Sequence, residues 1–370
     1  MGDGNIMKVL HVITSLDSGG AENLVKESLP IMKQKGLEPE VLLLSSKNNV
    51  FEDELRNEGI KIQKTGLNNV YSPRQIFKIK KFINGYDIVH THLFQPQYWT
   101  TIAKILYRSN TPIITTEHST NNRRREHKIF KNIDRFIYKK YDKIICISKE
   151  TEKNLIKWIP RISSKTIVVY NGTDLNKFRN SKPYKKEELI KNVGENSNSK
   201  LILMVSRFSV QKDHETLIRA AKLLSDDYHV ILVGEGSLKE DIILLVEKLN
   251  ISHRVHFLNY REDVERIMKS VDIYVQSSNW EGFGIAALEA MATGIPVIAS
   301  NTPGLSEVVE GGGVLFPKGD HISLANAIKD ISTSKKRYKE ISNNCMEKCK
   351  QFSIEKMVDE YIKIYSGLLK

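Results

Sequence analysis

The chain has 370 residues, of which 40% are hydrophobic and 27% charged, so it is long enough for two globular domains with separate cores. No apolar run approaches the roughly 20 residues that span a bilayer, and the start of the chain lacks the basic and apolar regions of a signal peptide. The three cysteines, Cys146, Cys345 and Cys349, form no paired framework, so we expect reduced thiols in a cytoplasmic protein.

The formal net charge of +12 belongs entirely to the first half of the chain. Residues 1–180 contain 30 Lys and Arg against 18 Asp and Glu, whereas residues 181–370 contain 26 of each sign. A basic half of this kind favours an anionic partner, which can be a nucleic acid, a membrane surface or a phosphorylated acceptor.

Short apolar runs alternate with amphipathic helical stretches along the first half. The runs that predict strands are Met7–Ile13, Glu40–Leu44, Ile60–Lys64, Asp87–His90, Pro112–Thr116, Lys143–Ile147 and Lys165–Val169. The alternation predicts a doubly wound parallel sheet, whose ligands lie beyond the carboxyl ends of the strands. Gly19 and Gly20 follow the first strand and permit close approach of a phosphate or sugar, but they do not form the dinucleotide-binding G-x-G-x-x-G pattern.

Histidines lie at the ends of two predicted strands. His90 and His92 are two residues apart, but without a nearby carboxylate or thiol we do not expect them to bind a metal. His118 comes just past the carboxyl end of a strand, where active-site residues collect. It is either a structural residue that caps its own loop or part of a site.

The segment Arg123–Tyr141 is the basic centre of the first half. Its apolar residues recur at helical spacing among lysines and arginines, and they are Ile129, Ile133, Phe136 and Ile137. Two interpretations stay open, a helix that packs on a core with a solvated polar face and a helix that lies on anionic lipid headgroups. The lipid-facing cations of the second interpretation are Arg123, Arg124, Arg125, Lys128 and Lys131.

The polar stretch Lys177–Lys200 predicts a linker, so we expect one domain at residues 1–180 and a second at residues 181–353. Strands of a second parallel sheet are predicted at Leu201–Val205, His229–Val233, Val255–Leu258, Asp272–Val275 and Pro296–Ala299. Arg207 and Lys212 follow the first of them, at a turn from strand to helix.

The stretch from Gln276 to Glu307, QSSNWEGFGIAALEAMATGIPVIASNTPGLSE, predicts a strand end, a polar turn, a helix from Phe283 to Thr293 and another strand. Glycines leave three backbone N–H groups open at the helix N-terminus, which is typical of an anion site, and these belong to Phe283, Gly284 and Ile285. Glu281 and Glu289 flank that site. A phosphate between two carboxylates indicates a ligand that is phosphorylated and rich in hydroxyls, such as a sugar nucleotide.

Seven residues separate the two glutamates in EGFGIAALE, which is followed by AMATGIPVIAS and TPG. This region resembles the Glu-x7-Glu region of retaining glycosyltransferases of family 4, and the resemblance covers nearly the whole chain. It implies the GT-B fold, in which two Rossmann-like doubly wound domains face each other across a cleft. It also implies that the second domain holds the donor and that a final helix, residues 354–370, packs back on the first.

The resemblance implies roles for individual residues. Arg207 and Lys212 match the cations that clamp the donor diphosphate, although serine and aspartate replace the first and last glycine of G-R-x-x-x-x-K-G. Glu281 would bind donor sugar hydroxyls and Glu289 the ribose diol, while His118 would lie under the transferred sugar. The other expected substrate-binding residues are Gly19, Gly20, Asn171, Tyr260, Arg261, Phe283, Gly284 and Ile285.

The implied reaction moves a hexose from a nucleotide diphosphate sugar, with UDP as the expected nucleotide, to an acceptor hydroxyl with retained configuration. No metal or other cofactor is expected, because the two cations and the helix N-terminus neutralise the diphosphate. The expected acceptor is a lipid-linked saccharide of surface polysaccharide assembly, such as capsule or lipopolysaccharide, met at the inner face of the cytoplasmic membrane. The alternatives are a sugar-nucleotide epimerase of the same fold and a basic nucleic-acid-binding protein.

Overall fold

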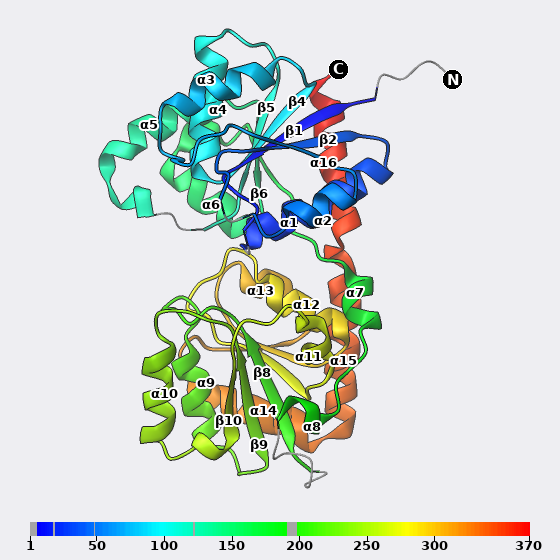
Figure 1. Ribbon diagram of the computed structural model, residues 1–370. Coiled ribbons are helices and arrows are strands. Elements are labelled where there is room, and N and C mark those ends of the chain that lie inside the picture. The colour runs from blue at the N-terminus through cyan, green and yellow to red at the C-terminus, as the bar shows by residue number, and fades with distance from the viewer. Residues whose placement is uncertain (1–5, 18, 48, 121–122, 191–197) are drawn as a thin grey trace. The chain divides into compact units, whose positions relative to one another are not determined.

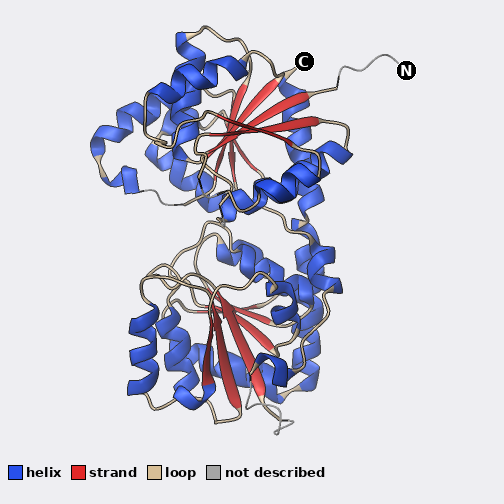
Figure 2. Ribbon diagram, in the orientation of Figure 1, coloured by secondary structure: helices blue, strands red, loops and turns tan. Residues whose placement is uncertain are grey.

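The computed structural model describes residues 6–17, 19–47, 49–120, 123–190 and 198–370, and the chain divides into two compact units (Figure 1). The first unit comprises Met1–Gly172 together with Ile354–Lys370, and the second comprises Thr173–Ser353. In each unit a parallel sheet lies between helices (Figure 2). Both units are therefore Rossmann-like α/β domains.

The first unit contains a seven-stranded parallel sheet in the order β3-β2-β1-β4-β5-β6-β7. Its strands are β1 (Lys8–Ile13), β2 (Glu38–Leu43), β3 (Lys61–Lys64), β4 (Ile88–His92), β5 (Ile113–Glu117), β6 (Lys143–Cys146) and β7 (Thr166–Val168). The seven strands predicted from the sequence are confirmed, and no end differs by more than two residues.

Helices cover both faces of this sheet, because successive side chains of each strand point to opposite faces. Val9 and Ile13 of β1 share a core with α1 (Gly20–Gln34), α2 (Glu52–Asn57) and α16 (Ile354–Leu368). Leu10 and Val12 face the other core, with α3 (Arg74–Ile83), α4 (Phe94–Leu106), α5 (Lys128–Lys139) and α6 (Lys149–Trp158). Two buried faces explain why these strands read as continuous apolar runs.

The second unit contains a six-stranded parallel sheet in the order β10-β9-β8-β11-β12-β13. Its strands are β8 (Lys200–Val205), β9 (Tyr228–Val233), β10 (Val255–Leu258), β11 (Ile273–Gln276), β12 (Val297–Ser300) and β13 (Val314–Phe316). Its helices are α7 (Leu175–Asn180), α8 (Lys186–Leu189), α9 (His214–Lys222), α10 (Lys239–Lys248), α11 (Val264–Lys269), α12 (Ile285–Thr293), α13 (Leu305–Val309), α14 (His321–Thr333) and α15 (Lys335–Cys349).

The division between the units falls after Gly172, earlier than the expected boundary at residues 180 and 181. Helices α7 and α8 occupy part of the stretch that the sequence predicted as a linker, and residues 191–197 lie outside the described residues. Helix α7 packs against α12, so this part of the stretch belongs to the second unit. Among the described helices, none has the length and apolar content needed to cross a membrane.

The strand orders place one reversal point in each sheet. Chain order reverses between β1 and β4 in the first sheet and between β8 and β11 in the second. Loops at the carboxyl ends of such strand pairs diverge to opposite faces and leave room for a ligand. These two places are therefore where a functional site is expected.

Candidate active site

Lys212 and Glu281 meet at the reversal point of the second sheet. Lys212 follows β8 and Glu281 follows β11, and the Lys212 Nζ donates a hydrogen bond to Glu281 Oε1 at 2.5 Å. The same oxygen accepts a bond from Ser278 Oγ at 2.7 Å, and Glu281 is only 5% exposed. An ammonium and a hydroxyl thus fix this buried carboxylate in one orientation. The sequence predicted both residues in the site, and the structure brings them into contact.

Arg207 is exposed on the loop after β8. Two glycines of the neighbouring loop brace this loop, since a Cβ at Gly234 would lie 2.2 Å from Ser206 O and one at Gly236 would lie 2.3 Å from Phe208 O. Among the described residues, Arg207 has no hydrogen-bond or ion-pair partner for its side chain. Its backbone is therefore held while its guanidinium stays available to an anion.

Helix α12 begins at Ile285, two residues later than the sequence predicted. Gly284 precedes it with φ 98° and ψ 48°, a left-handed conformation that favours glycine, and no side chain caps the helix. The first N–H groups of the helix are thus open to an anion. Phe283 is 2% exposed and its ring lies 5.5 Å from that of Phe352, so only its backbone can reach a ligand.

Glu289 lies in the second turn of α12 and is partly exposed. Burial raises the pKa of the Tyr274 phenol well above its ordinary value, and the charges of Glu289 and Glu281 raise it further. Both carboxylates therefore lie within electrostatic reach of one phenol. Their roles toward the ribose and the sugar stay predictions.

Tyr260 and Arg261 follow β10. Tyr260 is 55% exposed, whereas Arg261 forms two bonds to Asp263, Nε to Oδ1 at 2.7 Å and Nη2 to Oδ2 at 2.6 Å. The Arg261 guanidinium is thus already paired within its own loop, and any contact with a base falls more easily to the backbone or to Tyr260. Their predicted place near the base stays a prediction.

A pocket of about 290 Å³ lies at the reversal point of the first sheet. His118 lines it, as do polar residues that the sequence did not single out, namely Thr14, Ser15, Glu22, Gln95, Gln97, Thr116, Glu117 and Ser119. Gly20 opens α1, the helix that carries Glu22, and a Cβ at Gly20 would meet no atom within 4 Å. The neighbouring Gly19 precedes that helix with an ordinary negative φ. The backbone conformation therefore does not require glycine at either position.

Glu117 is a buried anion at this pocket. It accepts bonds from Gln97 Nε2 at 2.7 Å, from Arg125 Nη2 at 3.0 Å and from the Tyr138 hydroxyl. Burial alone would raise the pKa of Glu117, but Arg125 and Arg124 hold it below its ordinary value. The carboxylate therefore stays ionised at neutral pH. Only the position of Glu117 at the end of a predicted strand could have signalled it.

The histidines of β1 and β4 form a buried group with His118. Strand register pairs His11 with His90, and the ligand atoms of His11, His90 and His92 all lie within 4.8 Å of one another, a spacing that could hold a metal ion. The His90 nitrogens, however, contact the hydroxyls of Tyr365 at 2.6 Å and of Thr116 at 2.7 Å. Hydroxyls thus already satisfy His90. The absence of a metal stays a prediction.

Asn171 lies at the end of the first unit and is 5% exposed. Its side-chain oxygen is buried without a hydrogen-bond partner among the described residues. An unsatisfied buried acceptor is uncommon, so this position is compatible with its predicted contact to a substrate.

Comparison with known proteins identifies the family. The model of "Glycosyl transferases group 1" matches residues 185–348, and that of "Glycosyltransferase Family 4" matches residues 18–177. The UDP-Gal:alpha-D-GlcNAc-diphosphoundecaprenol alpha-1,3-galactosyltransferase of Escherichia coli is 32% identical over 300 residues, which are 77% of this chain and 76% of that protein. The chain belongs to glycosyltransferase family 4.

Two further similarities extend over the whole of this family 4 transferase. The O-antigen biosynthesis glycosyltransferase WclY of Escherichia coli is 26% identical over 98% of this chain and 99% of its own. The structure of Anabaena Alr3699/HepE in complex with UDP matches with a TM-score of 0.84 and 23% identity, over 98% of this chain and all of that one. The GT-B fold expected from the sequence is thus confirmed, and neither the epimerase nor the nucleic-acid-binding alternative is favoured.

The basic segment of the transferase differs from its sequence-based interpretation. Arg124 and Arg125 were expected to face lipid, which is wrong, since Arg124 is 7% exposed and Arg125 bonds to Glu117. Arg124 Nε lies 3.2 Å from Asp134 Oδ2, and its guanidinium lies over the Phe94 ring at 4.6 Å. These cations are buried because they neutralise buried carboxylates. The Arg123 side chain lies outside the described part of the chain.

The apolar stripe of α5 is divided between core and solvent. Ile137 is buried, whereas Ile129, Ile133 and Phe136 are 71%, 41% and 52% exposed. Lys128 is exposed, and the partly buried Lys131 lies 5.5 Å from the centre of the Trp158 ring. One edge of this helix therefore packs on the core, while the other presents apolar side chains among cations, and its binding to lipid headgroups stays a prediction.

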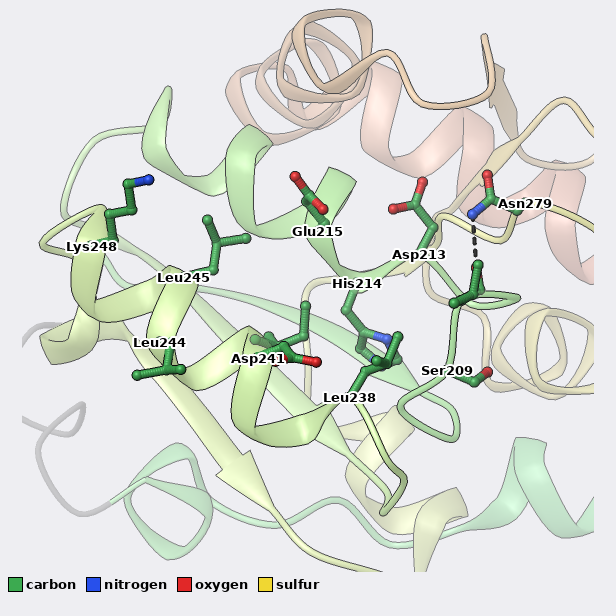
Figure 3. Close-up of a pocket in the computed structure, with 12 residues that line it drawn as sticks. Ser209, Asp213, His214, Glu215, Leu238, Asp241, Leu244, Leu245, Lys248 and Asn279 are labelled. Carbon is green, nitrogen blue, oxygen red and sulfur yellow. Dashed lines mark hydrogen bonds between the residues drawn. The ribbon is translucent and has the colours of Figure 1, made fainter.

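Another hollow, of about 530 Å³, lies between α9 and α10 of the transferase (Figure 3). Leu238, Leu245 and His214 line it, and Asn279 Nδ2 donates to Val210 O at 2.8 Å on its rim. The described residues that line this hollow do not include Arg207, Lys212, Glu281 or Glu289. None of these four described residues, which were predicted to bind the donor, lines it, although Asp213 on its wall directly follows Lys212.

Proposed function

We propose that this transferase moves a hexosyl group from a UDP-sugar to a hydroxyl of a saccharide carried on a polyprenyl diphosphate, with the anomeric configuration retained. The observation that carries the proposal is the contact of Lys212 with Glu281 beside the exposed Arg207. Cations that suit a diphosphate and a carboxylate that suits sugar hydroxyls stand together where two loops diverge. A relative whose name gives UDP-Gal as donor and a diphosphoundecaprenol-linked acceptor supports it, as does a structural neighbour that binds UDP.

The second unit holds the donor in this proposal. Arg207 and Lys212 bind the diphosphate and stabilise the charge that the leaving group gains as the bond to the anomeric carbon breaks. The first N–H groups of α12 bind a phosphate oxygen. Glu281 accepts bonds from the sugar, and Glu289 accepts two from the ribose diol. These groups neutralise the diphosphate without a metal ion.

The first unit binds the acceptor. Its pocket contains His118 with the carboxylates of Glu22 and Glu117, a polar lining that suits a hydroxyl-rich saccharide. The acceptor oxygen bonds to the face of the anomeric carbon that the phosphate leaves, and the leaving phosphate oxygen takes the acceptor proton. No nucleophile of the protein takes part.

The lipid carrier places the enzyme at the inner face of the cytoplasmic membrane as a peripheral protein. The exposed apolar side chains of α5 and the charge excess of the first half support this location. A carrier with two phosphates is itself anionic, so the same charge favours both the acceptor and its surroundings.

The test is a donor and acceptor panel. Purified protein is incubated with UDP-glucose, UDP-galactose, their N-acetyl forms and GDP-mannose, with a polyprenyl-diphosphate saccharide, a soluble saccharide or no acceptor. We expect a glycolipid product from one UDP-sugar, with the α configuration by NMR, and undiminished activity in chelator. An epimerised sugar nucleotide formed without acceptor would instead favour the epimerase, and exclusive use of the soluble saccharide would overturn the lipid-linked acceptor.

A further inference from the structure

Three imidazoles form a continuous row from the interior of the first unit to its pocket. His11 Nδ1 lies 3.0 Å from His92 Nε2, and His92 Nδ1 lies 3.1 Å from His118 Nε2. The His11 and His92 rings are nearly parallel, with an interplanar angle of 9°. His11 and His92 are each 1% exposed, whereas His118 is partly exposed and lines the pocket.

Each ring of this histidine row carries one proton at neutral pH. Burial lowers the pKa of His11 to about 3 and that of His118 to about 4, and it lowers the pKa of His92 well below the ordinary value. A neutral imidazole has one N–H donor and one acceptor nitrogen. The two hydrogen bonds that join the three rings can both form in only two arrangements. Either every ring carries its proton on Nδ1, or every ring carries it on Nε2.

Two observations favour the arrangement with every proton on Nδ1. His11 Nε2 is buried and has no hydrogen-bond partner among the described residues, and the other arrangement would leave a buried N–H there unpaired. At the opposite end, the ionised Glu117 lines the pocket with His118, and its charge acts on that ring. A negative charge beside His118 favours an N–H on its Nδ1, which carries partial positive charge, over a lone pair on that atom.

We propose that His92, itself held by His11, is a positioning residue that fixes His118 as the Nδ1–H tautomer. His118 then presents a single N–H donor at a set orientation to a substrate oxygen in the pocket. A donor with a fixed direction needs no reorganisation when the substrate binds, which is what makes such groups effective. The use of the His118 N–H in the reaction rests on the proposed glycosyl transfer, whereas the His118 tautomer is a property of the free protein.

The chain contains a matched control for this proposal. His90 is buried, lies two residues from His92 on the same strand, and bonds to the Tyr365 and Thr116 hydroxyls instead of to the histidine row. The His90 ring packs against His92 and His11, with centroids 4.3 Å and 5.2 Å apart, so replacing it disturbs the packing around the row but removes neither of the row's hydrogen bonds. Replacing His92 with Asn keeps an amide N–H near the place of the imidazole Nδ1–H, whereas Leu removes it.

The decisive measurement is the ¹⁵N spectrum of the histidine side chains in the free protein, with the His118 signals assigned by loss in H118Q. In the wild type and in H90Q we expect His118 to carry its proton on Nδ1 and a lone pair on Nε2. In H92L we expect mixed tautomers, and in H92N a return to Nδ1–H. A wild-type His118 protonated on Nε2 overturns the proposal, and so does an H92L spectrum identical to that of the wild type.

Turnover of the donor that the panel identifies provides the second readout. In H92L we expect kcat to fall roughly 10-fold to 100-fold, which is less than the loss of an oriented hydrogen-bond donor costs. The KM for the UDP-sugar is expected to change little, and H92N is expected to restore kcat in part. A fall in H90Q as large as that in H92L would mean that core damage explains the loss, and the proposal would be wrong. If no UDP-sugar is turned over, the proposed function fails while the spectra still decide the tautomer.

Discussion

Lys212 and Glu281 hold each other across two loops, with the Lys212 Nζ 2.5 Å from Glu281 Oε1. The pair is largely buried, because 21% of the lysine side chain and 6% of the glutamate side chain are exposed. A diphosphate that binds here therefore meets a cation that is already paired. We infer that the phosphate and the carboxylate share the ammonium in the complex, so that the sugar-binding and phosphate-binding parts of the site are coupled.

Replacing Lys212 with Ala removes the ammonium that is proposed to stabilise the leaving diphosphate. It also leaves the buried Glu281 without its cation. We expect kcat to fall by about 10²-fold to 10³-fold, the usual cost of losing one such group. The measurement is steady-state release of UDP. Arg219, whose guanidinium pairs with Glu215 on the exposed face of α9, provides a control, and R219A is expected to keep wild-type turnover. A K212A enzyme with wild-type kcat would contradict the proposed role.

Gly304 supports the loop that carries Glu281. It has φ 84°, and a Cβ there would lie 2.5 Å from Glu281 O and 2.9 Å from Gly282 O. Both the left-handed conformation and this collision oppose any side chain. We expect G304A to displace the glutamate and to reduce turnover at least 10-fold, as small misplacements in active sites do. Gly319 has φ 75° but open space around it, so G319A introduces the backbone strain without the collision. This control variant is expected to stay active.

The strands were predictable from the sequence because they are buried on both faces and stand out as apolar runs. The strand β13 was missed, since its three residues follow Gly311, Gly312 and Gly313 and give no run to detect. The predicted linker was partly wrong for a related reason. Helix α7 is six residues long and is polar in sequence, yet its Phe178 is buried.

The grouping of the candidate site residues was predictable where it depends on the strand ends that they follow. It was not predictable where it depends on the register between paired strands. Arg207, Lys212 and Glu281 follow strand ends, which the doubly wound pattern places at one edge. His11 stands in the middle of an apolar strand, and only the pairing of β1 with β4 brings it beside His90. The burial of Arg124 and Arg125 was likewise hidden, because the charge pattern of the segment says nothing about the buried carboxylates that face it.

The buried position of Arg124 predicts a stability role. Replacing it with Ala leaves Asp134 buried without its cation, and breaking such pairs costs about 3–5 kcal/mol of unfolding free energy. Chemical denaturation of R124A is expected to show a loss of that order. The exposed Arg135 of the same helix serves as a comparison, and R135A is expected to change stability by less than about 0.5 kcal/mol. Equal stability of R124A and wild type would contradict the buried pair.

The buried histidines predict that stability falls in mild acid. The pKa of His11 is lowered to about 3 by burial, so in the folded state the ring stays neutral while the unfolded chain takes up a proton below pH 6.5. The stability from this residue is present above pH 6.5 and is lost as pH falls toward 3, at up to about 1.4 kcal/mol per pH unit. Denaturation of wild type and H11N at pH 7, 6 and 5 tests this. We expect the loss of stability with acidity to be smaller in H11N, and equal slopes would contradict it.

The exposed edge of α5 predicts binding to anionic membranes. Ile129, Ile133 and Phe136 present apolar side chains to solvent. The exposed cations around them are Lys128, Arg135 and Lys139 of the same helix and Lys140, which directly follows it. Apolar groups enter the lipid boundary, and each basic residue near an anionic surface contributes about 1 kcal/mol. Because Arg124 and Arg125 are buried, changing them would test folding and not lipid binding.

The variant that tests this binding is therefore I133E combined with F136E, two substitutions at exposed positions that should leave the fold intact. We expect the wild type to co-sediment with phosphatidylglycerol vesicles at low salt and less at high salt, since salt screens the charge, and the double variant to bind weakly at both. Leu244 is 62% exposed on α10 of the second unit, and residues 181–370 have no net charge. L244E, which places one carboxylate at an exposed apolar position away from α5, is therefore expected to keep binding. Equal binding by the double variant and by L244E would show that α5 is not the contact. A wild type that ignores the vesicles at low salt would leave the basic first unit without a lipid partner and would favour an acceptor reached from solution.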